Sequence, residues 1–294
     1  MAYIESELLR TLPRVLRARD FRLYLEGSKR LVDLWLAGGR AVLGHKPPKV
    51  LSEMKNAAER GLFTALPHPA EKRFFKALSE FFPDRAFRLY TNSGSLCQAL
   101  SEAGFPSPNK TALVDPAFGT GGNAGSDGPG SVSLWRPFLE PSAGVGGSPE
   151  AESRKASVVI PVLPWPLGPE VLVLDKNIED SFPKGELIPP VLLAPAARAL
   201  YTLIAVMKAK AKGQNYPRYH KIEKTLKNQA NWRRRGIYLT FEPHTDREKY
   251  AALFQRFLEG GFLIPPCVNE PVILPMSMSP GEESKLAGLL EQDI

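Results

Sequence analysis

The chain has 294 residues, of which 43% are hydrophobic and 23% are charged. These values are typical of a globular protein with one large or two moderate domains, and they exclude a disordered chain or a collagen-like repeat. The formal net charge of +7 is mild for this length. Cys97 and Cys267 lack CxxC spacing and the histidines lack i,i+4 spacing, so we expect neither a disulfide framework nor a metal site. Glu5 and Glu7 make the N-terminus unlike a secretory signal, so we expect a cytoplasmic protein.

Proline is unusually frequent. It accounts for 28 of the 294 residues, or about 9.5%, whereas about 5% is ordinary. More than half of the prolines lie between Pro106 and Pro195. Each interior proline removes a helical hydrogen bond, so this region is not expected to be a run of long helices. It also holds a glycine-rich stretch at 118–147 with no GxxxxGK[ST] motif, which predicts a surface loop over residues 117–150 rather than a nucleotide-binding loop.

Periodicity predicts helices and one hairpin in the first 82 residues. Apolar residues on one face predict a helix up to Leu16, and alternation around Gly27 predicts a β-hairpin over residues 21–36. Residues 49–61 and 69–82 are expected to be helices, because proline stands at the start of each and apolar side chains recur at helical spacing.

A strand, a turn and a helix then follow in close succession. Residues 86–91 predict a strand, residues 92–95 a turn and residues 96–103 a helix. Free backbone N–H groups and the dipole at a helix start attract anions, and the hydroxyls of Ser93 and Ser95 add two donors. The turn is therefore a candidate anion site, although Ser93 or Ser95 acting as a plain N-cap explains the pattern equally well.

The centre and the tail of the chain alternate strands with helices. Residues 157–163 and 170–174 predict buried strands. The apolar stretch 190–207 is interrupted by proline and arginine, so residues 194–211 predict a buried helix rather than a membrane span. The tail predicts a compact α+β lobe, with strands at 236–242, 262–264 and 272–274 and with helices at 246–259 and, after an N-cap at Ser279, at 280–291.

Basic residues are concentrated between Lys208 and Arg235, where ten Lys or Arg accompany a single acid, Glu223. Such a cluster could bind nucleic-acid phosphates. The favoured interpretation is a solvated basic helix over residues 219–235, because no recognised nucleic-acid module accompanies it. Nucleic-acid binding through residues 208–235 stays a remote alternative.

Four segments carry motifs in an order that one enzyme family shares. They are LEGSKRLVDL at 25–34, LGHKPPKV at 43–50, FRLYTNSGS at 87–95 and YAALFQRFLEGGFLIPP at 250–266. Together they resemble the class III branch of the fold type I, pyridoxal-phosphate-dependent aminotransferases, which includes glutamate-1-semialdehyde aminomutase. The likeness covers residues 20–105 and 236–294, and four motifs in order are more specific than any one of them.

The resemblance implies a fold, a cofactor and partners. The expected fold is α/β, with a PLP-transferase-like large domain at 46–235 that has a reduced central sheet and flanking helices. Residues 1–45 and 236–294 would form a smaller α+β domain. Ser93, Gly94 and Ser95 match the turn that holds the cofactor phosphate. A homodimer, and amino or keto acid substrates if the protein is active, are also implied.

Departures from the family pattern bear on catalysis, which requires a lysine amine and an acid at the pyridine nitrogen. Leu96 and Cys97 replace the family's Glu-Ala, and residues 156–163 (ASVVIPVL) lack the acidic strand end. Lys176 is the best match for the lysine, and Lys155 is a poorer one. Lys176 could equally be a surface residue at a strand end.

Two hypotheses follow, one for each interpretation of Lys176. In the first, the chain is a diverged aminotransferase-like protein that keeps the fold and an anion pocket but has lost Schiff-base chemistry. In the second, it is an active aminotransferase or aminomutase that binds pyridoxal phosphate and uses Lys176. The first is favoured, because the acid is missing and the lysine is ambiguous.

Overall fold

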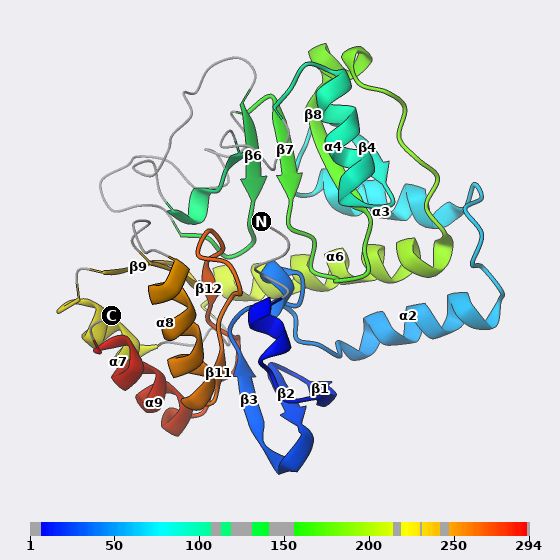
Figure 1. Ribbon diagram of the computed structural model, residues 1–294. Coiled ribbons are helices and arrows are strands. Elements are labelled where there is room, and N and C mark those ends of the chain that lie inside the picture. Colours follow the sequence, from blue (N-terminus) through cyan, green and yellow to red (C-terminus); the bar gives the residue numbers. More distant parts are fainter. Residues whose placement is uncertain are drawn as a thin grey trace. The chain divides into compact units, whose positions relative to one another are not determined.

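The computed structural model describes residues 7–106, 113–118, 131–140, 156–213, 219–229, 231–241 and 247–292 (Figure 1). The chain divides into two compact units. One combines the two chain ends, residues 1–46 and 209–294, and the other is residues 47–208.

A five-stranded sheet organises the unit of residues 47–208. Its order is β4-β8-β7-β6-β5. Strand β8 is antiparallel to both β4 and β7, whereas β5, β6 and β7 are parallel. It follows that β4 runs in the same direction as β5, β6 and β7. The strands are β4 (Arg85–Tyr90), β5 (Leu113–Val114), β6 (Val132–Trp135), β7 (Val158–Pro161) and β8 (Glu170–Asp175).

The two central strands β7 and β8 confirm the buried runs predicted near 157–163 and 170–174. Val158, Val159 and the four residues of β8 from Val171 to Leu174 are at most 1% exposed. Strands that are covered on both faces have nearly continuous apolar sequences, as these two do. The predicted reduced central sheet with flanking helices is therefore confirmed.

Helices cover both faces of this sheet, as alternation along β4 shows. Phe87 stacks on Phe75 of helix α3 with ring centroids 5.7 Å apart, whereas Tyr90 packs in a core cluster with Leu96 and Leu100 of helix α4. Because residues 87 and 90 have opposite parity, they point to opposite faces of the strand. The helices of this unit are α2 (Pro48–Glu59), α3 (Pro69–Ser79), α4 (Ser93–Glu102) and α6 (Pro190–Ala211).

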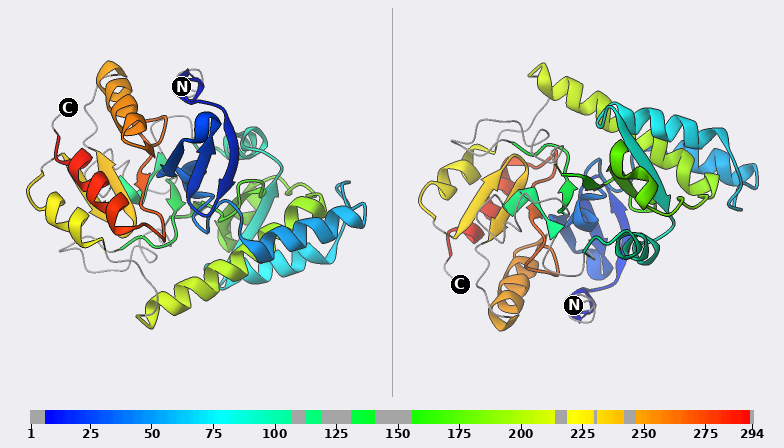
Figure 2. Two further views of the ribbon diagram at one scale, coloured as in Figure 1. Left: turned by 90° about the horizontal axis from the view of Figure 1, so that it is seen from below. Right: turned by 90° about the horizontal axis from the view of Figure 1, so that it is seen from above.

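Helix α6 lies along α3 (Figure 2), with the Tyr201 hydroxyl donating to the Arg73 carbonyl at 3.3 Å. Among the described residues it is the one helix long and apolar enough to cross a membrane by length and composition. In that apolar window 56% is buried inside the structure. This burial agrees with the core helix predicted for residues 194–211, which in the structure begins earlier, at Pro190.

The unit built from both chain ends contains two sheets among its described residues. The first sheet has the order β1-β2-β3-β11 and the second β12-β10-β9. Strand β11, from the C-terminal part, pairs in parallel with β3 of the N-terminal hairpin. The strands are β1 (Val15–Arg19), β2 (Arg22–Leu25), β3 (Arg30–Asp33), β9 (Trp232–Arg235), β10 (Tyr238–Phe241), β11 (Phe262–Leu263) and β12 (Val272–Ile273).

The helices of the same unit are α7 (His220–Leu226), α8 (Arg247–Glu259) and α9 (Pro280–Leu290). Ser279 caps α9, as predicted, through a capping box in which its side chain accepts from the Glu282 amide and the Glu282 side chain accepts from the Ser279 amide. Each side chain thereby satisfies a backbone donor that the helix itself leaves unpaired.

Three sequence predictions are wrong. Helical conformation ends at Arg10 rather than Leu16, and Val15–Arg19 is strand β1, because it pairs with β2. The basic helix predicted for 219–235 ends at Leu226, and Trp232–Arg235 forms strand β9 against β10. Within the loop predicted for 117–150, Val132–Trp135 is strand β6, which lies between β5 and β7. The rest of that loop, apart from 117–118 and 131–140, lies outside the described residues.

Candidate functional site

The carboxyl ends of four strands define the edge at which a ligand site is expected. Because β4, β5, β6 and β7 share one direction, the residues that directly follow them meet at the same edge of the sheet. These residues are Thr91, Asp115, Arg136 and Val162. Open α/β sheets bind ligands outside the carboxyl ends of their strands.

The turn after β4 is built around an asparagine cap. The Asn92 side-chain oxygen accepts from the Ser95 amide at 3.0 Å, so Asn92 is the N-cap of α4, and neither Ser93 nor Ser95 is. Both serines belong to the first turn of the helix instead. A Cβ at Gly94 would lie 2.9 Å from the Asn92 side-chain oxygen, so a larger residue would displace the cap.

Glu186 reaches this turn from a distant part of the chain. One oxygen of its carboxylate accepts from the Thr91 amide at 2.7 Å and from the Thr91 hydroxyl at 2.6 Å. Hydrogen bonds from the Thr91 hydroxyl and then the Thr91 amide hold the pKa of Glu186 below its usual value. The carboxylate is therefore ionised and bound by the residue that precedes the N-cap of α4.

Main-chain contacts of Gly185 and Glu186 with strand β4 hold Glu186 beside Thr91. The Glu186 amide donates to the Leu89 carbonyl of β4 at 2.7 Å. A Cβ at Gly185 would lie 2.8 Å from the Leu89 nitrogen, so this close approach requires glycine. Glu186 was not predicted from the sequence, because its partner Thr91 lies 95 residues earlier and no local pattern connects the two.

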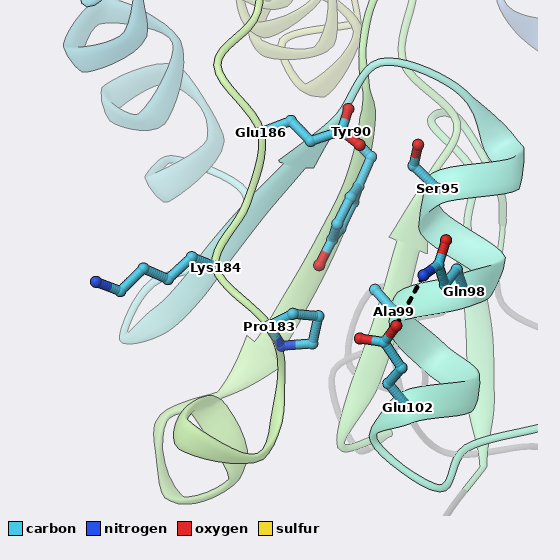
Figure 3. Close-up of a pocket in the computed structure, with 8 residues that line it drawn as sticks. All are labelled: Tyr90, Ser95, Gln98, Ala99, Glu102, Pro183, Lys184 and Glu186. Carbon is cyan, nitrogen blue, oxygen red and sulfur yellow. Dashed lines mark hydrogen bonds between the residues drawn. The ribbon is translucent and has the colours of Figure 1, made fainter.

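A small pocket of about 170 Å³ lies between this segment and α4 (Figure 3). The Tyr90 hydroxyl is buried there without a hydrogen-bond partner among the described residues, and burial raises its pKa. Figure 3 shows the Lys184 side chain pointing away from the pocket. The lining residues are Tyr90, Ser95, Gln98, Ala99, Glu102, Pro183, Lys184 and Glu186.

Lys176 is not brought together with Ser93, Gly94 and Ser95. In the register of β4 with β8, Arg85 faces Asp175 and Tyr90 faces Glu170. Lys176 therefore lies at the end of the sheet opposite the turn, roughly 17 Å away for five strand residues. Its side chain is 65% exposed, and its amine is 3.9 Å from the Asp84 carboxylate. Lys155 lies outside the described residues.

A buried ion pair lies at the carboxyl edge, where the sequence analysis predicted no pair. The Arg136 guanidinium donates to both oxygens of Asp115, with distances of 2.6 to 3.0 Å, and the Asp115 carboxylate also accepts from the Ala117 amide at 3.0 Å. The Arg136 side chain is 4% exposed and that of Asp115 12%. A charged residue directly after each of the two short apolar segments that form β5 and β6 was the signal available in the sequence.

The basic stretch is divided among three elements, the end of α6, α7 and β9. Arg234 donates to the Glu223 carboxylate at 2.7 Å and to the Gly236 carbonyl at 2.7 Å, and its guanidinium lies 5.2 Å from the centre of the Tyr219 ring. At least this arginine has internal partners, which favours the structural interpretation of the stretch over nucleic-acid binding. Among the described residues, no group of three or more His, Cys, Asp or Glu side chains could hold a metal ion.

No family model matches the chain. An uncharacterized protein of Treponema pallidum is 24% identical over 317 residues, which cover 94% of this chain and 93% of that one. A glutamate-1-semialdehyde 2,1-aminomutase of Thermus thermophilus is 29% identical over 85 residues, which cover 29% of this chain and 20% of the enzyme.

Among solved structures, an ornithine δ-aminotransferase of Plasmodium falciparum matches with a TM-score of 0.63. The match has 14% identity and covers 99% of this chain and 96% of that one. The fold is that of the fold type I PLP-transferases. At this identity the likeness establishes the fold and leaves the activity to the site itself.

Proposed function

We propose that this chain is a diverged protein of the class III, glutamate-1-semialdehyde aminomutase-like branch that keeps the fold and has lost Schiff-base chemistry. Its role would then be one of binding or structure. The unit 47–208 corresponds in this proposal to the predicted large domain, and the unit of the two chain ends to the small domain. A cytoplasmic homodimer is part of the same proposal.

One observation carries it, namely the composition of the carboxyl edge. The first four residues after each of β4, β5, β6 and β7 include no lysine. Of the residues that directly follow these strands, only Asp115 is an acid, and both of its oxygens bind Arg136. The described residues at this edge therefore do not fit pyridoxal phosphate, which needs an amine and an uncommitted carboxylate.

Arg136 would also oppose the cofactor's function at that position. The pyridine nitrogen must stay protonated, and an anion beside it favours the protonated form. A carboxylate already neutralised by a buried guanidinium supplies little of that field. Lys184 lines the neighbouring pocket, but its side chain points away from it. The described residues that follow these four strands thus lack two of the groups that the reaction requires.

The test uses the purified full-length protein incubated with pyridoxal phosphate. After dialysis, we expect no stoichiometric cofactor in the visible spectrum. After borohydride reduction, we expect no stoichiometric pyridoxyl-lysine adduct by mass spectrometry. A stoichiometric adduct at one lysine would contradict the proposal, and its position would identify the lysine of an active enzyme.

Lys176→Ala is the matched variant for the second hypothesis. If any adduct forms at low yield on surface lysines, it should be unchanged in this variant. Loss of a stoichiometric adduct on replacing Lys176 would establish the active alternative, with Lys176 as the Schiff-base residue. The dimer is tested separately by light scattering on the same preparation.

A further inference from the structure

An anion that belongs to the chain already lies beside the start of α4. Thr91, the residue before the N-cap, donates its amide and its hydroxyl to one oxygen of Glu186. Helix starts attract anions because several N–H groups and the positive end of the dipole point the same way. The Glu186 carboxylate, bound to the adjoining Thr91, lies where that field favours a negative charge.

Glu186 is not needed as a cap, since Asn92 already fills that role through its bond with the Ser95 amide. Its carboxylate uses other donors, those of Thr91. Its backbone is also bound to Leu89, and Gly185 allows the segment to lie directly against β4. The position of the carboxylate is thus set by main-chain contacts as well as by its own hydrogen bonds.

We propose that Glu186 is the built-in anion of this turn, so that its carboxylate takes the place of a phosphate group and closes the Thr91–Ser95 turn to phosphate-bearing ligands. This inference deepens the proposed function and rests on it for the identity of the site. It explains why a turn that resembles a cofactor-phosphate motif persists in a chain whose other cofactor groups are missing.

The charges around the turn indicate that Glu186 excludes a phosphate group from it, and that the two anions do not bind there together. A phosphate placed beside Glu186 would meet a negative charge, and like charges a few ångströms apart repel even where solvent weakens their interaction, as at this exposed turn. Lys184, the basic residue among those lining the pocket, points its side chain away from it. Binding of phosphate therefore requires that Glu186 leave its hydrogen bonds with Thr91.

Calorimetric titration with inorganic phosphate tests the inference on the full chain. We expect no measurable binding to the wild-type protein at millimolar phosphate and at least tenfold tighter binding to Glu186→Ala. Glu102→Gln is the matched control, because it removes a charge from the same pocket without touching Thr91. It should behave as the wild type does.

Glu186→Gln keeps an acceptor oxygen but has no charge. It replaces Glu186→Ala in the phosphate titration if circular dichroism shows that Glu186→Ala does not fold. It too should gain phosphate binding. Wild-type binding as tight as that of the variants would overturn the inference, as would equal gains in Glu102→Gln or no gain in a folded Glu186 variant. Each of these results leaves the test for a lysine adduct unaffected, so the two proposals fail separately.

Discussion

The ion pair between Arg22 and Glu282 gives a quantitative prediction for the unit built from both chain ends. The Arg22 guanidinium donates to the two Glu282 oxygens at 3.0 and 2.6 Å, and the side chains are 16% and 12% exposed. Glu282 also accepts from the Ser279 amide at 2.8 Å, within the capping box of α9. The pair connects strand β2 near one chain end to a helix near the other.

The lowered pKa of Glu282 sets how much its ion pair with Arg22 contributes to the free energy of unfolding. Burial opposes its ionisation, but hydrogen bonds from Arg22 and Ser279 outweigh burial and lower the pKa from 4.5 to about 2. This difference corresponds to an upper bound of roughly 3 kcal/mol of folding stability. Solvent screening of a partly exposed pair reduces the expected contribution to about 1–2 kcal/mol.

The pH dependence follows from the lowered pKa. Stability from this carboxylate is fully present above pH 4.5, the value for the unfolded chain, and is lost as pH falls from 4.5 towards 2. Glu282→Gln should therefore lower the free energy of unfolding by about 1–2 kcal/mol at pH 7, and by no more than half as much at pH 3.

Urea unfolding at the two pH values, followed by circular dichroism, measures both quantities. Glu248→Gln, which alters an exposed acid in the first turn of α8, is the control and should change stability by under about 0.5 kcal/mol. A Glu282→Gln effect equal at pH 7 and pH 3 would refute the reasoning, because it would not come from ionisation.

Three further predictions concern single residues. Asp115→Asn removes the charge that neutralises the buried Arg136 guanidinium and should cost about 3–5 kcal/mol in urea unfolding; a cost below about 1 kcal/mol would show that the pair is dispensable. Ser279→Ala deletes the N-cap of α9 and should cost about 1 kcal/mol, and an unchanged urea midpoint would contradict the capping box. Lys176→Ala should change stability by under about 0.5 kcal/mol, since its ion pair is exposed, and a larger loss in the same assay would argue for a buried role.

The sequence predicted best those elements whose signals are local or wholly buried. Strands β7 and β8 are continuous apolar runs, and the helix at 280–290 follows a Ser279 cap with Glu282 three residues later. The strand, turn and helix at 85–102 were also predicted, although the cap proved to be Asn92.

The wrong predictions share a physical cause, because each concerns a strand held by pairing rather than by its own pattern. Val15–Arg19 has apolar residues at helical spacing, but it pairs with β2. Trp232–Arg235 is basic and continues a helical pattern, yet it pairs with β10 across Gly236, which has a φ of 66°. Strand propensity depends on such neighbours more than helix propensity does.

The hydrogen-bonded pairs between residues far apart in the sequence were the part of the site that could not be predicted from the sequence. Glu186 and Thr91 are 95 residues apart, and Asp115 and Arg136 are 21 apart. Only the fold brings these partners together. A motif at 92–95 was visible in the sequence, but the carboxylate that engages the adjoining Thr91 was not.

In the proposed cofactor-free protein, these pairs would replace contacts that a bound cofactor makes. A site that holds a charged ligand leaves donors and charges unpaired until the ligand binds, and such groups are costly when buried. Here the Asp115 charge is met by Arg136, and the Thr91 donors by Glu186. Among the described side chains lining the pocket, the Tyr90 hydroxyl is the buried group left without a partner. In the proposed cofactor-free protein, the buried Asp115–Arg136 pair would therefore take the place of ligand contacts at this edge.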